Sequence, residues 1–417
     1  MKVTAIIAEY NPLHSGHKYH MEEARRQTQA DFLVILMSGN YVQRGTPALL
    51  SKQIRCEMAL AAGADLVLEL PLTYACSSAE FFADGAINLL NGLGVVDNLC
   101  FGCETPDAYL FDIIAEILLS EPLTYQKQLK EQLKQGFPYP AARSCALLQY
   151  IHETIKTFPI SEKNLSDFLN SPNNILGIEY AKAIRKSHSR IKPVCIQRVG
   201  SSYHDTDVNH AFCSASALRE LIEKSTHPSM TINSIKELIP EETLPLYQKA
   251  FEQYPPLYTG DFSLLLKYKL MQEDPESLTR YLDMPQSLSK RIYNQLNHYR
   301  SWDEFVSLLK TKEFTYTRIQ RALLHTLLEL TWHPAITYAR ILGFRKSAGP
   351  LLNQIKNKGT IPLLSKLNSS DSMLSPEEKA RMQKEIHSDN LYSSVFAARY
   401  NRDFVHEQQK QIIIHSS

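Results

Sequence analysis

The sequence predicts an α/β domain with a parallel β-sheet, followed by a domain made only of helices. Short apolar runs rich in β-branched residues alternate with helix-forming segments over the first two hundred residues. A helical stretch over about residues 105–170 interrupts this alternation, and from residue 226 only helical apolar spacing remains. Because 417 residues can form two cores, we expect domains at 1–225, with a helical insertion at about 105–170, and at 226–417.

The chain opens with a predicted strand, a tight turn and a helix. Residues 3–8 (VTAIIA) are apolar and too few for a helix. Pro12 ends the run, because proline cannot continue a central strand. Helix-forming residues follow from Gly16 onward. The turn between strand and helix carries His14 and His17.

Further strands and helices follow in alternation. We expect strands at 31–37, 65–71, 95–101 and 191–199, and helices at 51–62, 81–93, 171–184 and 213–222. In a parallel sheet, ligands bind at the carboxyl ends of the strands. The loops expected there are 9–17, 38–48, 71–76 and 102–104. In the C-terminal part, helices are expected at 263–272, 276–282, 287–298, 302–309, 315–330 and 334–342.

The first turn has the features of an anion site. The first N–H groups of a helix lack internal partners and carry partial positive charge. Gly16 permits close approach of a phosphate, and the imidazoles of His14 and His17 can donate hydrogen bonds to its oxygens. A zinc site is disfavoured because no third ligand is spaced nearby. Two ordinary surface histidines are the other alternative, which their position directly after a strand disfavours.

A second candidate phosphate site lies some two hundred residues later. Ser214 and Ser216 offer hydroxyl groups at a predicted helix start, and Arg219 follows one turn on. Capped helices are common, so this pattern alone is weak evidence. Together with the histidines of the first turn, it predicts a site that holds a polyphosphate from two sides.

These motifs resemble those of a known superfamily. His14-Ser-Gly-His17 is similar to the H-x-G-H signature of the nucleotidyltransferases, which have a Rossmann-like sheet, and the serine-rich, Arg-ending segment resembles their second phosphate motif. The wider context, EYNPLHSGH at 9–17 followed by MSGNYVQRGTPA at 37–48, resembles the bacterial tRNA(Met) cytidine acetate ligase family.

The resemblance implies a two-step ligase reaction. Such enzymes activate acetate with ATP as acetyl-adenylate, releasing pyrophosphate, and pass the acetyl group to N4 of the wobble cytidine of elongator tRNA(Met). ATP is then a substrate, Mg²⁺ is expected with it, and acetate and the tRNA are the partners. Two alternatives stay open: a small-molecule adenylyltransferase of the same superfamily, and a non-catalytic tRNA-binding protein.

The resemblance also implies site residues. His14 and His17 would carry the catalysis. Asn173, chosen over Asn174, would be a nucleotide contact, and a second pocket would hold acetate or cytidine. The implied ATP-binding residues are Ile7, Ala8, Glu9, Tyr10, Asn11, Pro12, Leu13, His14, Ser15, Gly16, His17, Lys18, Tyr19, His20, Gly102, Asn173 and Arg198, to which Ser214, Ser216 and Arg219 are added, and the implied acetate or cytidine residues are Ser38, Gly39, Asn40 and Arg44.

The distribution of charge points to a polyanion partner for the later part of the chain. Net charge is only +1, but residues 290–366 hold thirteen Lys and Arg against four Asp and Glu. Arginines near aromatic residues suit backbone contacts and base stacking in RNA. The predicted tRNA contacts are Arg318, Arg321, Arg340, Arg345 and Lys346. A solvated basic face is the alternative that charge alone leaves open.

Composition predicts a cytoplasmic protein. Hydrophobic residues make up 44% and charged residues 21%, as in ordinary globular proteins. No apolar run approaches the roughly 18 residues that a membrane span needs. Seven cysteines without framework spacing indicate reduced thiols, and Cys100 and Cys103 are expected to pack rather than bind metal. No pattern indicates an oligomeric state.

Overall fold

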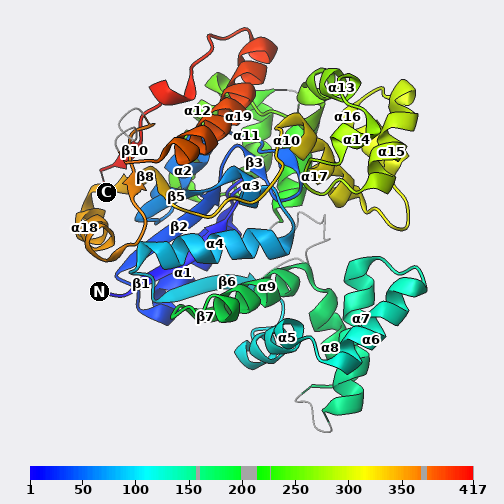
Figure 1. Ribbon diagram of the computed structural model, residues 1–417. Helices are drawn as coiled ribbons and strands as arrows, with labels where there is room; N and C mark the ends of the chain where they lie inside the picture. Colours follow the sequence, from blue (N-terminus) through cyan, green and yellow to red (C-terminus); the bar gives the residue numbers. More distant parts are fainter. Residues whose placement is uncertain (156–159, 199–213, 226, 368–372, 417) are drawn as a thin grey trace.

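The computed structural model describes residues 1–417 except 156–159, 199–213, 226, 368–372 and 417 (Figure 1). Its centre is an eight-stranded sheet in the order β10-β8-β5-β2-β1-β6-β7, with β9 paired to β8, and a separate two-stranded hairpin of β3 and β4. The strands are β1 Val3–Ala8, β2 Phe32–Ser38, β3 Tyr41–Val42, β4 Thr46–Pro47, β5 Leu66–Leu70, β6 Asn98–Cys103, β7 Lys192–Gln197, β8 Ala339–Arg345, β9 Leu363–Leu364 and β10 Ile413–His415.

The five strands predicted in the N-terminal part form the parallel half of this sheet. β1 pairs with β2 on one side and with β6 on the other, both parallel. The chain therefore builds outward from β1 to β2 and β5, then returns to β6 and β7 on the opposite side. Such a reversal leaves a crevice at the carboxyl ends of β1 and β6, where ligands of open α/β sheets bind.

Helices cover both faces of the sheet (Figure 1). They are α1 Ser15–Thr28, α2 Lys52–Ala61, α3 Leu72–Ala75, α4 Ala79–Leu93, α5 Ala108–Ser120, α6 Leu123–Lys134, α7 Tyr139–Thr154, α8 Glu162–Asn170, α9 Pro172–Lys186, α10 Ala215–Lys224, α11 Pro228–Ile235, α12 Leu244–Gln253, α13 Ser263–Met271, α14 Pro275–Leu278, α15 Gln286–Gln295, α16 Trp302–Leu309, α17 Tyr316–Leu327, α18 Gly349–Lys358 and α19 Pro376–Tyr400.

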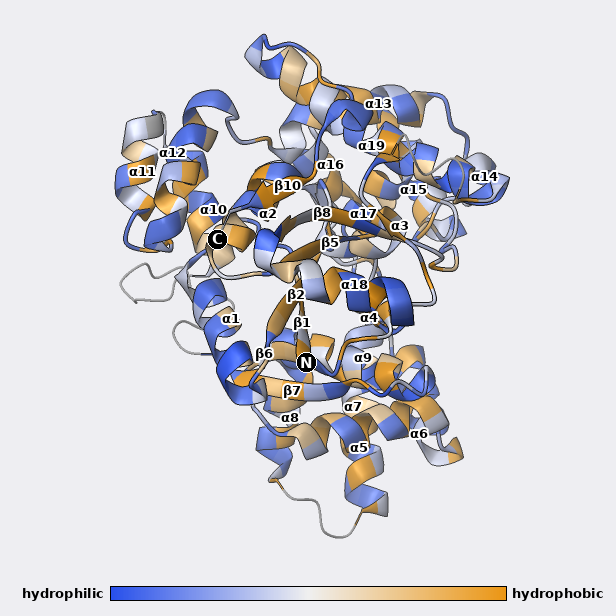
Figure 2. Ribbon diagram, turned by 90° about the vertical axis from the view of Figure 1, so that its left-hand side faces the viewer, coloured by the Kyte–Doolittle hydropathy of each residue, from blue (hydrophilic) through white to orange (hydrophobic). Residues whose placement is uncertain are grey.

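Alternation along the strands divides the core into two layers. Ala5 packs with α4, α5 and α9, whereas its neighbour Ile6 packs with α1, α2 and α10 to α12. Figure 2 shows these strands as an apolar layer between amphipathic helices. Helices α13 to α17 form a third core with part of α19 and with Tyr41 of the hairpin. The helical insertion is confirmed as α5 to α8.

The expected helix over 334–342 is wrong. Residues 339–345 form strand β8, which pairs antiparallel with β5, and β9 and β10 join it. The C-terminal part is therefore mainly helical but adds three strands to the sheet. A short apolar run fits a helical or an extended pattern equally well. Here the segment is extended because it pairs with β5, which is distant in the sequence. Within the described residues, no helix is both long and apolar enough to span a bilayer.

Candidate active site

A cavity of about 440 Å³ opens at the carboxyl ends of β1, β6 and β7. It lies at the crevice that the strand order predicts. Its walls come from the β1–α1 turn, the end of β6, the start of α9, the end of β7 and the start of α10. The lining residues are Ile6, Ile7, Ala8, Glu9, Tyr10, Asn11, His14, Gly16, His17, Tyr19, His20, Gln43, Arg44, Ala79, Phe82, Phe101, Gly102, Pro172, Asn173, Ile175, Leu176, Tyr180, Ile196, Gln197, Arg198, Ser214, Ala215, Ser216 and Arg219.

The two imidazoles are held in a defined tautomer by the first turn of α1. The Gly16 N–H donates to Nδ1 of His14 (3.1 Å), and the His14 N–H donates to Nδ1 of His17 (3.2 Å). An Nδ1 that accepts a hydrogen bond is unprotonated, so each neutral ring carries its proton on Nε2. The rings stack with centroids 3.7 Å apart. The turn therefore offers two Nε2–H donors side by side.

Burial keeps these rings neutral. It lowers the pKa of His14 to about 3, and the charges of Arg198 and Arg219 add to this effect. Burial also lowers the pKa of His17 well below its usual value, assisted by His14 and Arg198. The pKa of His20 falls to about 4 for the same main reason. The histidines thus act near neutral pH as hydrogen-bond donors and not as cations.

The backbone at the start of α1 differs from the expectation. The Ser15 N–H donates to the Leu238 carbonyl (2.9 Å), and the Gly16 and His17 N–H groups donate to Nδ1 and to the carbonyl of His14. These amides already have acceptors, so the prediction that they bind phosphate is wrong for this conformation. The imidazoles are the donors that α1 presents to the cavity.

The start of α10 faces the same cavity and is tied to the first turn. Ser214 caps α10 by accepting from the Ala217 N–H (3.1 Å). Arg219 donates to the Asn11 carbonyl (2.6 Å) and to the hydroxyl of Ser216 (2.9 Å). Two segments some two hundred residues apart in sequence therefore meet through one guanidinium. The structure brings the two predicted phosphate motifs together on one cavity.

Another part of the wall carries the other predicted nucleotide residues. Gly102, Asn173 and Arg198 all line the cavity, from the ends of β6 and β7 and the start of α9. A Cβ on Gly102 would lie 3.4 Å from Cγ of Arg198, so these two residues are neighbours in the wall. Asn174 lies behind this wall, fully buried, with its Oδ1 accepting from the Glu104 N–H (3.0 Å). Burial lowers the pKa of Arg198, and the Glu104 charge opposes this.

Several lining residues escaped sequence reasoning. Phe101, Leu176 and Tyr180 form an apolar wall beside Gly102 and Asn173. Apolar residues in predicted strands and helices indicate only a core, so they gave no signal. Gln43 and Gln197 also line the cavity, and each directly precedes a predicted site arginine, which is a signal that could have found them.

Some predicted residues lie away from the cavity. Of the segment 7–20, Pro12, Leu13, Ser15 and Lys18 do not line it. Lys18 instead pairs with Glu242 (2.7 Å).

The predicted acetate or cytidine pocket at Ser38, Gly39 and Asn40 is wrong. The Ser38 hydroxyl has no hydrogen bond within the described structure, and the carbonyls of Ser38 and Gly39 accept from the buried guanidinium of Arg55. Asn40 is buried and donates to Asp389 (2.9 Å). These backbone and side-chain groups are used to connect the β2 loop to α2 and α19. Only Arg44 of the predicted set lines the cavity.

Behind this loop lies a buried ionic cluster, which we define as Lys52, Glu69, Arg340, Asp389 and Glu407. Lys52 Nζ contacts Glu69 (2.7 Å), Glu407 (3.0 Å) and Asp389. Arg340 contacts Glu69 (3.0 Å), Glu407 (2.6 Å) and Asp389 (3.2 Å). Burial disfavours the charge of Lys52, but the carboxylates outweigh this and raise its pKa. Arg340 is thus a structural residue, and its prediction as a tRNA contact is wrong.

The other predicted tRNA residues have different surroundings. Arg321 pairs with Asp283 (2.8 Å), and Arg345 donates to the carbonyls of Ala64 and Leu60 (3.0 and 2.6 Å). Lys346 is exposed. Because these contacts are made within the protein, Arg321 and Arg345 stabilise the fold.

Arg318 lies on α17, where it stacks over the ring of Phe314 with a cation to centroid distance of 5.2 Å. Lys310 and Lys312, in the loop before α17, are exposed, and neither pairs with a carboxylate of the described chain. These three residues form a basic group near the start of α17.

The loop that carries Arg44 packs directly on α17. Gly45 has φ +77°, and a Cβ there would lie 2.5 Å from the backbone N of Arg321. Only glycine combines this conformation with this contact. Arg44 therefore lies where the cavity meets the helical part of the chain.

We expect Gly45→Ala to separate this loop from α17. The substitution combines a left-handed conformation with a backbone clash, so it should lower the free energy of unfolding by about 2–4 kcal/mol. Gly136→Ala is a matched control, because Gly136 also has positive φ (84°) but no atom lies within 4 Å of the point that a Cβ would occupy there. Chemical denaturation should show a loss of only about 1 kcal/mol for the control. Equal losses would contradict the packing role of Gly45.

Comparisons with known proteins decide the family. The model of the family described as HIGH Nucleotidyl Transferase matches residues 1–408. A tRNA(Met) cytidine acetate ligase from Acetivibrio thermocellus is 38% identical, with 99% of this chain and all of that protein aligned. One from Clostridium novyi is 39% identical over 88% of this chain and 90% of that protein. The chain belongs to the tRNA(Met) cytidine acetate ligase family.

Solved structures agree with membership in the tRNA(Met) cytidine acetate ligase family. Thermotoga maritima TmcAL bound with alpha-thio ATP superposes with a TM-score of 0.89 at 29% identity, and the apo form with 0.91, each over the whole of both chains. The predicted nucleotidyltransferase type of sheet with a helical C-terminal part is confirmed at the level of the fold.

Proposed function

We propose that the protein is an ATP-dependent acetate ligase that acetylates N4 of the wobble cytidine of elongator tRNA(Met). The observation that carries this proposal is the meeting of two phosphate-binding motifs on one cavity. Imidazole donors of α1 and the hydroxyl and guanidinium groups of α10 reach it from separate segments, joined by the contact of Arg219 with Asn11 (2.6 Å). The substrates in this proposal are taken from the names of the relatives, which are tRNA(Met) cytidine acetate ligases.

In the first step acetate attacks the α-phosphate of ATP, and pyrophosphate leaves. Negative charge grows on the phosphate oxygens, where His14 and His17 donate through Nε2–H. Since both rings are neutral, no proton has to be gained before they act. Arg219 and Arg198 add positive charge. Acetyl-adenylate then remains in the cavity, and AMP leaves after transfer.

Mg²⁺ belongs to this proposal as a part of the substrate. Among the described lining residues, Glu9 is the only carboxylate, and its Oε1 accepts from the Gln43 N–H (2.9 Å). The wall therefore does not provide the several oxygen ligands of a resident metal site. The ion would arrive on the triphosphate and be held mainly by its oxygens.

In the second step the cytidine amine attacks the acetyl carbonyl. Arg44 occupies the side of the cavity next to α17, so we place acetate or the incoming cytidine beside it. No general base for this step stands out among the described lining residues. A cytoplasmic location, where tRNA is modified, is part of the proposal and agrees with the free thiols of the described cysteines.

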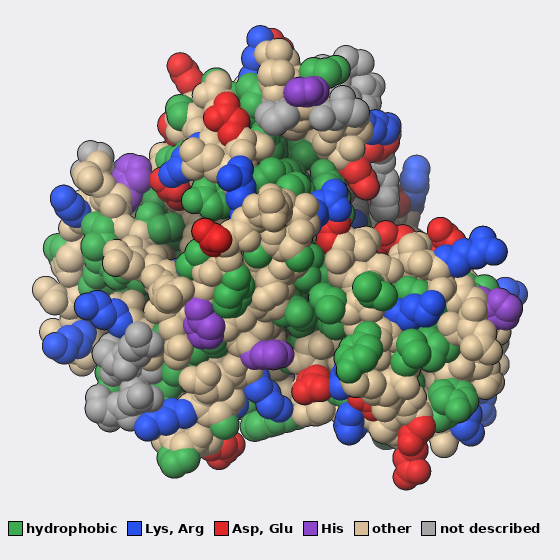
Figure 3. All heavy atoms as spheres, turned by 90° about the horizontal axis from the view of Figure 1, so that it is seen from above, with side chains coloured by type: hydrophobic (Ala, Val, Ile, Leu, Met, Phe, Trp, Pro, Cys, Tyr) green, Lys and Arg blue, Asp and Glu red, His purple; other side chains and the backbone are tan. Residues whose placement is uncertain are grey.

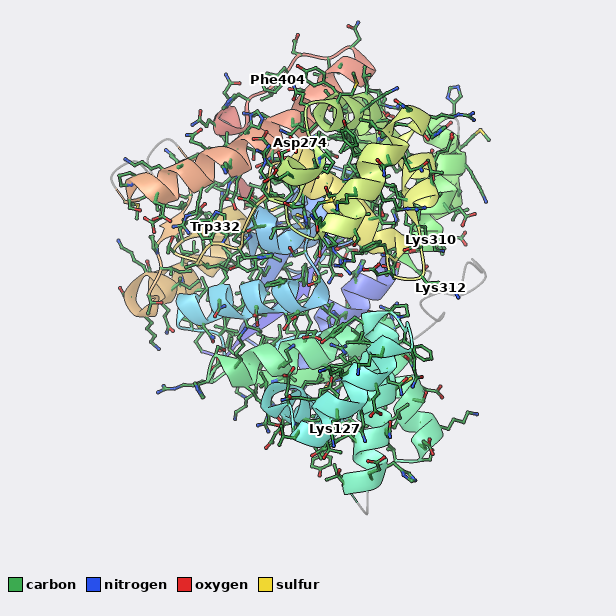
Figure 4. The ribbon with its side chains drawn as sticks, turned by 45° about the vertical axis from the view of Figure 1, so that its right-hand side comes forward. Lys127, Asp274, Lys310, Lys312, Trp332 and Phe404 are labelled. Atoms are coloured by element: carbon green, nitrogen blue, oxygen red, sulfur yellow. The ribbon has the colours of Figure 1, made fainter. Side chains whose placement is uncertain are left out.

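The basic group at the start of α17 is the proposed tRNA contact. In Figure 4 the labelled Lys310 and Lys312 lie on the side of the helical part that is nearest to the α5–α8 insertion. The face in Figure 3, by contrast, mixes Lys and Arg with acidic and apolar side chains. The tRNA would therefore approach Arg44 between the insertion and α17.

We expect Lys310→Gln combined with Lys312→Gln to weaken tRNA binding. Each lost phosphate contact reduces the slope of log affinity against log salt concentration by about 0.7–0.9. The double variant should thus lose roughly 1.5 from that slope while ATP affinity stays unchanged. Filter binding of tRNA over a range of salt concentrations measures this.

The control for that experiment removes the same charge elsewhere. Lys356 and Lys358 are exposed on α18, which lies on the opposite side of the molecule in Figure 1. Changing both to Gln should leave the salt slope within error of wild type. An equal loss in both double variants would indicate only a general charge effect.

The proposed function is tested with the purified protein, ATP, labelled acetate and tRNA(Met). We expect acetate-dependent exchange of pyrophosphate into ATP without tRNA, and N4-acetylcytidine in the nucleosides of tRNA after digestion and mass analysis. Pyrophosphate exchange that requires another small-molecule acceptor of the adenylyl group in place of acetate would favour a small-molecule adenylyltransferase. tRNA binding without any ATP turnover would favour a non-catalytic protein.

A further inference from the structure

Glu104 contacts the cavity wall from behind. It follows β6 directly, and it does not itself line the cavity. Asn173 Nδ2 donates to its Oε1 (2.6 Å), and the Asn174 N–H donates to its Oε2 (3.1 Å). The Glu104 N–H in turn donates to Oδ1 of Asn174 (3.0 Å). These contacts join the end of β6 to the first turn of α9.

The contacts determine which end of the Asn173 amide meets a ligand. An ionised carboxylate only accepts hydrogen bonds, so the atom that faces it must be the NH₂ group. Oδ1 of Asn173 makes no hydrogen bond to another described residue, and Asn173 lines the cavity. The amide therefore offers an acceptor there.

Glu104 also determines what the start of α9 can bind. Its carboxylate occupies the Asn174 N–H and places a negative charge at the positive end of the helix dipole. A phosphate is disfavoured at that position. The neighbouring Phe101 and Leu176 are apolar and suit the flat nucleoside half of ATP instead.

We propose that Glu104 is a positioning residue for the nucleotide. By holding Nδ2 of Asn173 it reserves Oδ1 for a hydrogen-bond donor on the nucleoside, either the 6-amino group of adenine or a ribose hydroxyl. This inference rests on the proposed function in one respect, namely that ATP occupies the cavity.

Glu104→Gln reverses the arrangement with almost no change in shape. The side-chain oxygen of Gln can replace only one of the two carboxylate acceptors. The Asn174 N–H is fixed by the backbone, so the oxygen should face it and the new NH₂ group should face Asn173. The Asn173 amide then turns over and presents Nδ2 to the cavity, which converts the acceptor into a donor.

Equilibrium binding to the full chain tests this, by calorimetry with ATP, inosine triphosphate, 2′-deoxy-ATP and 3′-deoxy-ATP. In the wild type, we expect the analogue that lacks the recognised donor to bind about 10-fold more weakly than ATP. Glu104→Gln should bind ATP about 10-fold more weakly and discriminate against that analogue by no more than about 2-fold. Weaker binding of inosine triphosphate would identify the 6-amino group as the recognised donor. Weaker binding of 2′-deoxy-ATP or 3′-deoxy-ATP would identify the corresponding ribose hydroxyl.

The ratio between ATP and analogue is the readout, because removing a charge near Arg198 alters the affinity for every triphosphate alike. Glu116→Gln, an exposed change on α5, should keep the wild-type ratio. Glu104→Ala provides a second variant, and it should also lose the discrimination. Equal affinity of the wild type for all four nucleotides, or an unchanged ratio in Glu104→Gln, would overturn the inference. Absence of ATP binding by the wild type would overturn the proposed function itself.

Discussion

Replacing His17 by Ala is expected to reduce acetate-dependent pyrophosphate exchange by about 100- to 1000-fold, the usual effect of losing one oriented donor to a developing charge. His17 Nε2–H is fixed by the contact of its Nδ1 with the His14 N–H (3.2 Å). Alanine removes the donor and also the ring stacked on His14. The tRNA should still bind, since the basic group on α17 is untouched.

Two controls separate this effect from a loss of folding or of charge. His152→Ala, at an exposed position on α7, should keep the wild-type exchange rate. Because burial lowers the pKa values of both site histidines, the wild-type rate should not fall as pH rises through the usual His pKa of about 6.5. A rate lost above that pH would mean that an imidazolium acts. An unchanged rate in His17→Ala would remove the histidines from the chemistry.

Lys52→Met is expected to lower the free energy of unfolding by about 3–5 kcal/mol, the cost of breaking a buried ion pair by removing one partner. The Lys52 ammonium is fully buried and contacts three carboxylates. After the change, Arg340 still contacts Glu69, Asp389 and Glu407, and Lys410 still pairs with Glu407 (2.9 Å), but no cation replaces the ammonium of Lys52 between the three carboxylates. These residues join α2, β5, β8 and the C-terminal segment, so α19 should also become accessible to proteases.

Lys224→Met is the matched control for the buried cluster. Lys224 pairs with Glu220 on the surface of α10, with its side chain 72% exposed. Such pairs contribute about 0–1 kcal/mol, so denaturant unfolding should barely change. A loss below about 1 kcal/mol in Lys52→Met would show that the cluster does not hold the C-terminal part to the sheet.

Local patterns in the sequence were sufficient to predict the strands of the parallel half of the sheet. The run at residues 3–8, the break at Pro12 and the helix after Gly16 form one strand, turn and helix, as predicted. Parallel pairing then forces the ends of β1 and β6 together, which is why the predicted loops 9–17 and 102–104 contribute to the cavity lining. Of the other two predicted loops, 38–48 contributes only Gln43 and Arg44, and 71–76 contributes no residue. The positions of strands, turns and helices follow from the residue types in turns and from the lengths of apolar runs, and both features are local in the sequence.

Long-range pairing could not be predicted in the same way. Strand β8 forms because the edge of β5, which begins at Leu66, is available for pairing more than 270 residues earlier. The residues 339–345 themselves do not indicate with which segment they pair. Arg340 looked like an RNA contact because its three carboxylate partners are distant in sequence. Asn40 was predicted as a site residue because loops at the carboxyl ends of strands usually bind ligands. In the structure, its side-chain amide instead donates a hydrogen bond to Asp389.

A structure of the protein with a non-hydrolysable ATP analogue tests the central claim most directly. We expect triphosphate oxygens within hydrogen-bond distance of Nε2 of His14 and His17 on one side and of the Ser216 hydroxyl and Arg219 guanidinium on the other. A triphosphate bound away from both groups, or held by only one of them, would contradict it.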